Sequence, residues 1–116
     1  MKRLILSSLL LIALPAIAYS HTSLLSSDPP RNAVLQSPPQ KVTVNFLGAA
    51  EPAFSKLEVF DSKGNKVSKK AKFLEENTVM EVELSEGLKS GEFSVKWICI
   101  GLDGHKTQGS YKFTVK

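Results

Sequence analysis

Two histidines, one near each end of the chain, are the residues best suited to chemistry. His21 follows Ala18-Tyr19-Ser20, a small-x-small pattern of the kind that signal peptidase cleaves. Cleavage after Ser20 would make His21 the first residue, so its α-amine and its imidazole Nδ1 could chelate a metal ion. His105 lies two residues after Asp103, and in an extended segment this spacing puts both side chains on one side. Together these groups offer three nitrogens and one oxygen, which suit tetragonal Cu(II).

Both histidines also have interpretations without a metal. His21 could be a residue that is merely tolerated after a cleavage site. Asp103 and Gly104 could form an ordinary turn that leaves His105 as an exposed loop residue. A shared metal site requires the start of the processed chain to lie beside the segment 101–109, as it would if the first strand pairs near the end of the domain.

Residues 1–20 have the features of a secretory signal peptide. Lys2 and Arg3 provide the charged start, and an apolar run over 4–14 follows. That run is short for a stable anchor, and no second apolar run is long enough to span a bilayer. We therefore expect a signal peptide over 1–20 and a single domain over 21–116, exported and not inserted in the membrane after processing.

Composition narrows the class of partner. The formal charge is +4 for the full chain and becomes +2 when Lys2 and Arg3 are removed. The lysines are scattered and no aromatic residues are interleaved with them, so nucleic-acid binding is not indicated. Cys99 is the only cysteine, which excludes an internal disulfide. No cysteine lies at the cleavage site, which disfavours a lipid anchor.

The processed chain shows strand alternation and turn residues in place of helical periodicity. Apolar residues alternate with polar ones over several short segments, chiefly 42–46, 80–84, 93–99 and 111–115. Gly, Pro, Asn and Asp clusters separate these segments at the spacing of a sandwich or barrel. The pattern predicts an all-β fold, a small antiparallel Greek-key β-sandwich or barrel with about seven strands.

Three local expectations follow from the same pattern. The residues 22–27 should form a first strand or extended arm. Val34 and Leu35 should insert into the core between two proline-rich breaks. The residues 101–109 should form a loop that carries His105 at the mouth of the sandwich.

Cys99 has two interpretations. A blue-copper site uses two histidines, a cysteine and a weak axial ligand. Cys99 lies close to His105 in sequence, but no methionine follows them. Strand parity puts Cys99 on the same side as Trp97, facing inward, where a cysteine behaves as a small apolar residue. We therefore expect a buried core thiol.

Several segments of the chain resemble a known family. Four segments are similar to the CopC/PcoC-like periplasmic copper-binding proteins. They are the opening Ser26-Ser27-Asp28-Pro29, the strand over 42–46, Trp97 with the Asp103-Gly104-His105 loop that follows it, and the strand over 111–115. The resemblance covers essentially residues 21–116. The combination of an N-terminal histidine with a W…D-x-H loop is its most specific part.

The resemblance implies a cupredoxin-like β-domain in the periplasm that binds one Cu(II) per chain. It implies that His21, Asp103 and His105 are the metal ligands. It also implies a role in copper homeostasis or copper resistance as a carrier or buffer without catalysis. A membrane copper transporter of the CopD type is the partner that the family suggests.

Two departures from the family pattern change these expectations. Many members carry a methionine-rich loop for Cu(I), whereas this chain has only Met1, which is removed, and Met80, which fits the core side of a strand. We therefore expect no Cu(I) site, because a soft site needs several thioethers. Lys106 stands where the family often has proline, which puts a positive charge beside the metal.

Two other functions remain compatible with the sequence. An N-terminal histidine and a second histidine also form the copper brace of oxidative polysaccharide-cleaving enzymes, although nothing in this small domain suggests a flat aromatic substrate face. The second alternative is a structural or adhesive β-sandwich without a metal. Turnover of ascorbate and oxygen would distinguish the first, and metal analysis the second.

Overall fold

The structure is a computed structural model and describes residues 24–116. The described chain contains no helix, and hence none long and apolar enough to cross a membrane. It forms eight strands: β1 (Leu24–Asp28), β2 (Val34–Leu35), β3 (Lys41–Phe46), β4 (Lys56–Phe60), β5 (Lys72–Leu74), β6 (Val79–Glu83), β7 (Gly91–Ile100) and β8 (Lys106–Val115).

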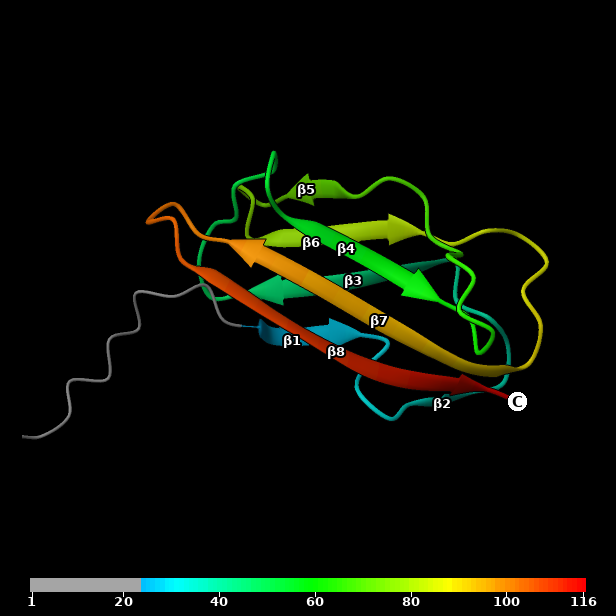
Figure 1. The fold of residues 1–116 in the computed structure, drawn as a ribbon. Helices are drawn as coiled ribbons and strands as arrows, with labels where there is room; N and C mark the ends of the chain where they lie inside the picture. Colours follow the sequence, from blue (N-terminus) through cyan, green and yellow to red (C-terminus); the bar gives the residue numbers. More distant parts are fainter. Residues whose placement is uncertain (1–23) are drawn as a thin grey trace, which may run out of the picture.

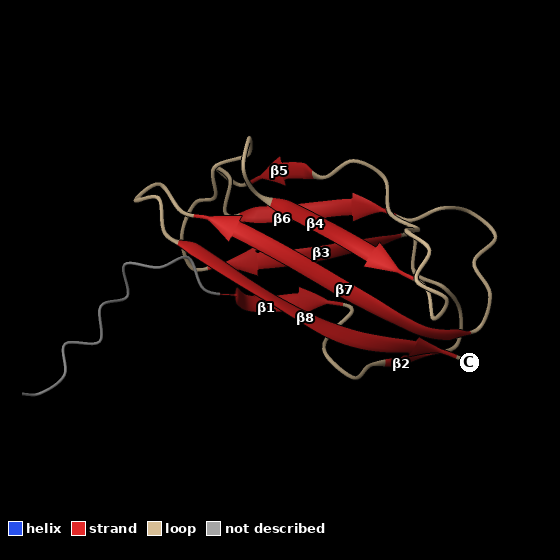
Figure 2. Ribbon diagram, viewed as in Figure 1, coloured by secondary structure: helices blue, strands red, loops and turns tan. Residues whose placement is uncertain are grey.

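The strands form two four-stranded sheets that pack face to face (Figure 1). One sheet has the order β1-β3-β6-β5 and the other the order β2-β8-β7-β4. All pairs are antiparallel except β2 and β8, which run parallel. Figure 2 shows that loops alone connect the strands. The expected all-β sandwich is confirmed, with one strand more than the pattern predicted.

The core lies between the sheets and follows the period-two alternation of the sequence. In β3 the side chains of Val42, Val44 and Phe46 are buried, while the residues between them are only partly covered. The Phe46 ring meets the Trp97 ring of the other sheet edge to face, with centroids 5.3 Å apart. The arrangement suits the quadrupoles of two aromatic rings and joins the sheets at one end of the molecule.

Two of the local expectations need correction. Val34 does not enter the core: it is 55% exposed because β2 pairs in parallel with β8 at the sheet edge, and only Leu35 is half-buried. The loop after β7 is also shorter than expected. Thr107 and Gln108 continue the ladder with β7, so that β8 begins at Lys106.

The first described strand pairs with β3, not with a strand near the end of the chain. Leu24 nevertheless lies opposite Phe46, at the end of the sandwich where β7 leads into β8 (Figure 1). We call this the D-x-H end. It consists of Leu24 and three loops, over 47–55, 75–78 and 101–105.

Backbone hydrogen bonds join the three loops of the D-x-H end. The Ala50 N–H donates to the Asn77 carbonyl at 2.8 Å, and the Glu51 N–H donates to the Ile100 carbonyl at 2.7 Å. The buried Ser55 hydroxyl accepts from the Ile100 N–H at 3.0 Å. The central loop 47–55 is therefore tied to both of its neighbours, so the three loops form one platform.

Candidate metal centre

The D-x-H residues form a tight turn between β7 and β8. The Gly101 N–H donates to the His105 carbonyl at 2.9 Å, and the Gly104 N–H donates to the Gly101 carbonyl at 2.9 Å. Gly104 has a φ of +83°, which glycine adopts without steric cost. Asp103 and His105 lie on the same side, as their spacing predicted, but a turn and not an extended backbone brings them together.

Asp103 contacts His105 with both carboxylate oxygens. Oδ1 accepts the His105 backbone N–H at 3.0 Å, and Oδ2 lies 2.7 Å from Nδ1 of the imidazole. When Nδ1 carries the proton, it donates to Oδ2, and Nε2 is then the nitrogen with a lone pair. A carboxylate that orients a histidine in this way is typical of metal sites.

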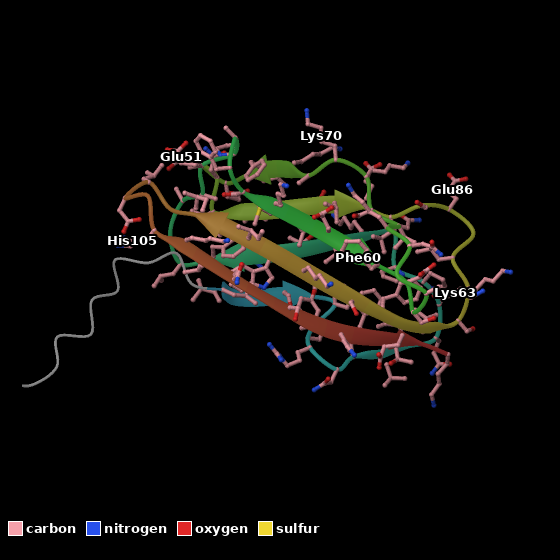
Figure 3. The ribbon with its side chains drawn as sticks, in the orientation of Figure 1. Glu51, Phe60, Lys63, Lys70, Glu86 and His105 are labelled. Atoms are coloured by element: carbon pink, nitrogen blue, oxygen red, sulfur yellow. The ribbon has the colours of Figure 1, made fainter. Side chains whose placement is uncertain are left out.

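The pair lies at the surface. The side chain of His105 is 59% exposed and that of Asp103 is 34% exposed. Figure 3 shows His105 and Glu51 at the same end of the molecule, with Lys63 and Glu86 at the opposite end. A metal ion or a partner protein can therefore reach the imidazole without any rearrangement of the core.

The pair supplies two donors, and a third must come from elsewhere. Within residues 24–116 no group of three or more His, Cys, Asp and Glu side chains is placed to hold a metal ion. His21, the third ligand expected from the sequence, lies outside the described residues. The ligand role of His21 therefore stays a prediction. The first described residue, Leu24, lies at the D-x-H end.

Two soft residues are buried in the core, as the sequence predicted. Cys99 is a fully buried thiol that forms no disulfide. Met80 is also fully buried, on the inner side of β6. The inward position of Cys99 contrasts with the exposed turn that holds His105, which argues against a shared blue-copper centre.

Sequence reasoning missed the surroundings of the pair. Glu51 and Phe54 belong to a loop about fifty residues away in sequence, and only the hydrogen bonds of the platform bring that loop to Ile100. No local pattern reports such a contact. Leu102 could have been noticed, since it is a large apolar residue within a polar turn, and it is 70% exposed.

A β-sandwich with a surface histidine oriented by a carboxylate defines a candidate metal-binding β-domain. The family model of the CopC domain matches residues 24–116. The chain is 34% identical over 100 residues to Protein YobA of Escherichia coli K12, covering 84% of this chain and 81% of that protein. Protein YobA of Shigella flexneri matches equally well. The chain belongs to the CopC family, which confirms the resemblance noted in its sequence.

Solved structures show the same fold. CopC from Methylosinus trichosporium OB3b has a TM-score of 0.76 and 31% identity, covering 83% of this chain and 94% of that one. PcoC, a methionine-rich copper resistance protein from Escherichia coli, has a TM-score of 0.72 and 28% identity, covering 83% and 99%. The family thus includes a copper resistance protein. The present chain contains only Met1 and Met80 and is not methionine-rich.

Proposed function

We propose that this protein binds one Cu(II) ion per chain in the periplasm and acts in copper homeostasis or resistance as a carrier or buffer, without catalysis. The observation that carries the proposal is the exposed pair in which Asp103 Oδ2 lies 2.7 Å from Nδ1 of His105. Membership of the CopC family supports copper as the metal.

The proposed ligands are His21, Asp103 and His105. In this structure Asp103 Oδ2 lies against Nδ1, on the opposite side of the ring from Nε2. Asp103 and His105 therefore bind one ion together only when the carboxylate has turned away from Nδ1. His21 contributes its α-amine and Nδ1 after removal of residues 1–20. Three residues of fully extended chain span at most about 11 Å, which sets the reach available between His21 and Leu24. A nitrogen-rich donor set with one carboxylate oxygen favours Cu(II).

The oxidation state follows from the same donors. Soft Cu(I) prefers thioether and thiolate sulfur. Among the described residues, the sulfur atoms belong to Met80 and Cys99, and both side chains are fully buried. We therefore assign no Cu(I) site to the domain. A membrane copper transporter of the CopD type is the proposed recipient or source of the ion.

The test is mass spectrometry and copper titration of the exported protein. The intact mass should correspond to a chain that begins with His21 and should rise by one copper ion when Cu(II) is added. Competition with a chelator should show strong binding that is lost in His21→Ala and in His105→Ala, and retained in the surface control Gln108→Ala.

A second variant tests the N-terminal amine. One alanine placed before His21 converts its α-amine into an amide, which should weaken binding as much as loss of the His21 imidazole does. A chain that begins with Tyr19 or Thr22, or unchanged affinity in the extended variant, contradicts the ligand set. Production of peroxide from ascorbate and oxygen at an enzymatic rate contradicts the carrier role.

A further inference from the structure

Exposed apolar side chains gather at the D-x-H end. Five of the six large hydrophobic residues that are exposed in the described chain lie in its loops or in the strand ends beside them. These five are Leu102 (70% exposed), Phe54 (68%), Leu25 (64%), Leu47 (49%) and Leu74 (40%). The sixth, Val34, lies in β2 at the other end of the sandwich (Figure 1). Such gathering of apolar surface marks an interaction site.

The same end carries a distinct charge. The loops 47–55, 75–78 and 101–105 contain no lysine or arginine and four carboxylates, those of Glu51, Glu75, Glu76 and Asp103. The rest of residues 24–116 contains thirteen lysines and arginines and seven carboxylates. The D-x-H end is thus acidic on an otherwise basic domain, although Lys106 stands directly beside it.

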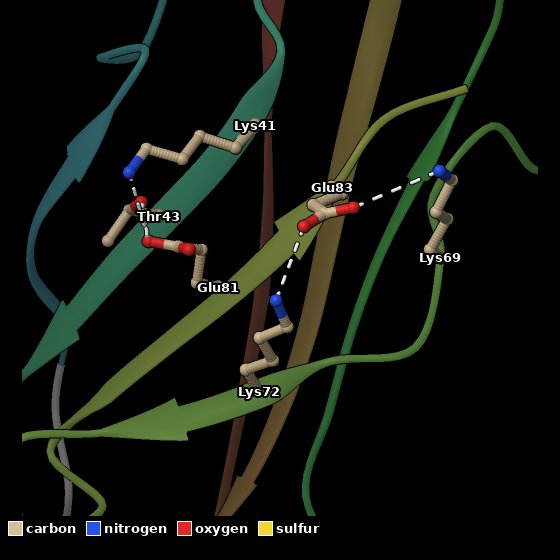
Figure 4. A network of polar contacts seen from close by, with 6 residues as sticks. All are labelled: Lys41, Thr43, Lys69, Lys72, Glu81 and Glu83. Carbon is tan, nitrogen blue, oxygen red and sulfur yellow. Dashed lines mark hydrogen bonds and ion pairs between the residues drawn. The ribbon is translucent and has the colours of Figure 1, made fainter. Parts of the chain in front are cut away.

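The glutamates of the D-x-H end differ in their ion pairing from Glu81 and Glu83, which lie on β6 in the sheet β1-β3-β6-β5. Glu83 lies 3.2 Å from the Lys72 ammonium and 3.8 Å from that of Lys69 (Figure 4). Glu81 lies 3.4 Å from Lys41 and also accepts a hydrogen bond from Thr43. The glutamates of the three loops have no such partners among residues 24–116. Asp103 contacts His105, whereas Glu51, Glu75 and Glu76 form no ion pair with a lysine or arginine among residues 24–116.

The backbone holds two of these glutamates in a strained conformation. Glu75, Glu76 and Asn77 have φ values of 50°, 54° and 65°, in the left-handed region that glycine and asparagine tolerate best. Asn77 suits such a position and the two glutamates do not. Backbone strain of this kind is typical of functional positions, and here it presents two carboxylates at the D-x-H end.

We propose that the D-x-H end is the docking surface for the protein that exchanges copper with this one, and that this partner presents an apolar face rimmed by lysine or arginine. The inference rests on the proposed copper function, because copper exchange is the reason for which a partner would dock here. The exposed apolar side chains supply contact area, and the unpaired glutamates select a basic rim. The platform is fixed by its hydrogen bonds, so docking requires no reordering of its loops.

Charge argues against two other occupants. A second copy that docks through the same surface would bring eight carboxylates of the loops together, and like charges across an interface oppose binding. A bilayer that contains anionic lipid would repel the same carboxylates. A basic-rimmed protein is the occupant for which both the apolar and the acidic residues are favourable.

The experiment is a binding titration of the ¹⁵N-labelled copper-free protein, followed by nuclear magnetic resonance. The probe is a synthetic amphipathic helix of leucine and lysine, and its counterpart of leucine and glutamate has the same apolar face. We expect shifts confined to the D-x-H end with the lysine helix and at least tenfold weaker binding of the glutamate helix. Raising the salt concentration should weaken binding of the lysine helix.

Matched variants separate the two contributions. Phe54→Ser combined with Leu102→Ser should weaken binding of the lysine helix about tenfold or more, since exposed anchors dominate such contacts. Glu75→Gln with Glu76→Gln should weaken it about threefold to tenfold at low salt and little at high salt. The controls Val34→Ser and Glu86→Gln lie away from the surface and should leave the affinity unchanged.

Each other outcome overturns the inference. Equal binding of both helices, shifts elsewhere on the domain, or no binding rejects the surface. Tighter binding to vesicles of phosphatidylethanolamine and phosphatidylglycerol indicates a membrane surface, and concentration-dependent self-association through these loops indicates a second copy.

Cu(II) affinity, measured separately, should be unchanged by Phe54→Ser with Leu102→Ser. If the unmodified protein bound no copper, the proposed function would be rejected. The helix titration uses copper-free protein, so it would still test the docking surface.

Discussion

Gly109 lies opposite Trp97 in the ladder between β7 and β8, and the indole occupies the space that a side chain at position 109 would need. A Cβ added to Gly109 would lie 2.7 Å from Cζ2 and 3.0 Å from Cε2 of Trp97. The same indole packs against the Phe46 ring of the other sheet. The glycine therefore allows the contact that joins the two sheets near the D-x-H end.

Gly109→Ala should destabilise the protein because the indole must move away from Phe46. Overpacking of this kind costs about 1–3 kcal/mol of unfolding free energy. Urea denaturation followed by fluorescence measures it directly, since Trp97 is the only tryptophan. Ser110→Ala, at the neighbouring exposed position, is the control and should change stability by less than about 0.5 kcal/mol. A Gly109→Ala protein as stable as the unmodified one would contradict the packing described.

Asp103→Ala should weaken Cu(II) binding without abolishing it. The substitution removes the proposed carboxylate donor, which water can replace in a tetragonal site. It also removes the oxygen that lies 2.7 Å from His105 Nδ1 and orients the imidazole. Loss of such a partner lowers metal affinity about 10–100-fold, whereas His105→Ala should abolish strong binding. Chelator competition measures both effects.

Asp61→Ala is the matched control for Asp103→Ala. Asp61 also accepts two backbone N–H groups within its own turn, those of Lys63 and Asn65, at the end of β4. Its loss should leave copper affinity unchanged. If both aspartate variants weakened copper binding equally, the effect would be a general loss of stability and not a property of the D-x-H turn.

Cys99→Ala should leave Cu(II) affinity and the copper absorption spectrum unchanged. The thiol is fully buried in the core, so its replacement should lower stability by about 1–2 kcal/mol through a small cavity. Calorimetry and a copper titration of the same sample separate the two effects. An intense blue absorption in the unmodified protein that disappears in Cys99→Ala would show that the thiol is a ligand after all.

Glu76→Gly should raise stability. A non-glycine residue in the left-handed region costs about 1–2 kcal/mol of folding free energy, which glycine would relieve. The greater conformational freedom of glycine in the unfolded chain offsets about half of that gain. The net gain should be about 0.5–1 kcal/mol by urea denaturation. Glu86→Gly, at a position whose own φ is not positive, should instead destabilise the protein. A loss of stability in Glu76→Gly would mean that the strained carboxylate contributes to folding.

Tyr111 should make the protein sensitive to alkali. Its hydroxyl is buried with no hydrogen-bond partner among the described residues. Burial raises the pKa of Tyr111 above its usual value of 10.0, and the Asp28 carboxylate raises it further. The Ser27 hydroxyl lies near enough to lower the pKa, although its geometry is not that of a hydrogen bond. The unfolded chain therefore loses this proton first, so stability should fall as the pH rises from about 10 towards the pKa of the folded state.

Tyr111→Phe tests that prediction. Because the hydroxyl is buried without a partner, its removal should be neutral or stabilising by up to about 1 kcal/mol at neutral pH. The fall in stability above pH 10 should be smaller in the variant, as measured by urea denaturation at several pH values. An identical pH dependence in both proteins would show that Tyr111 does not control it.

The core strands could be predicted from the sequence because their burial repeats with a period of two. Val42, Val44 and Phe46 follow that period, and all three are buried. The short strand β2 could not be predicted in the same way. It consists of two residues whose pairing with β8 depends on the path of the chain between two turns, and Val34 is exposed although it is apolar.

The candidate site was predictable only in part. Asp103 and His105 are neighbours in sequence, so their contact follows from local geometry. The position of the loop 47–55 beside them does not, because it depends on hydrogen bonds between segments that are distant in sequence, such as Glu51 to Ile100. The left-handed conformation at Glu75 and Glu76 was also unpredictable, since glutamate is not a residue that signals it.

The separation of β1 and β7 into different sheets has a consequence for the energetics of copper binding. Leu24 begins β1 in one sheet, and the D-x-H turn connects two strands of the other. A copper ion held by His21 and His105 would act as a reversible crosslink between the two sheets. The domain has a single cysteine and therefore no internal disulfide to do the same. Loading would then slow separation of the sheets, and resistance to proteolysis would report on how much metal the protein carries.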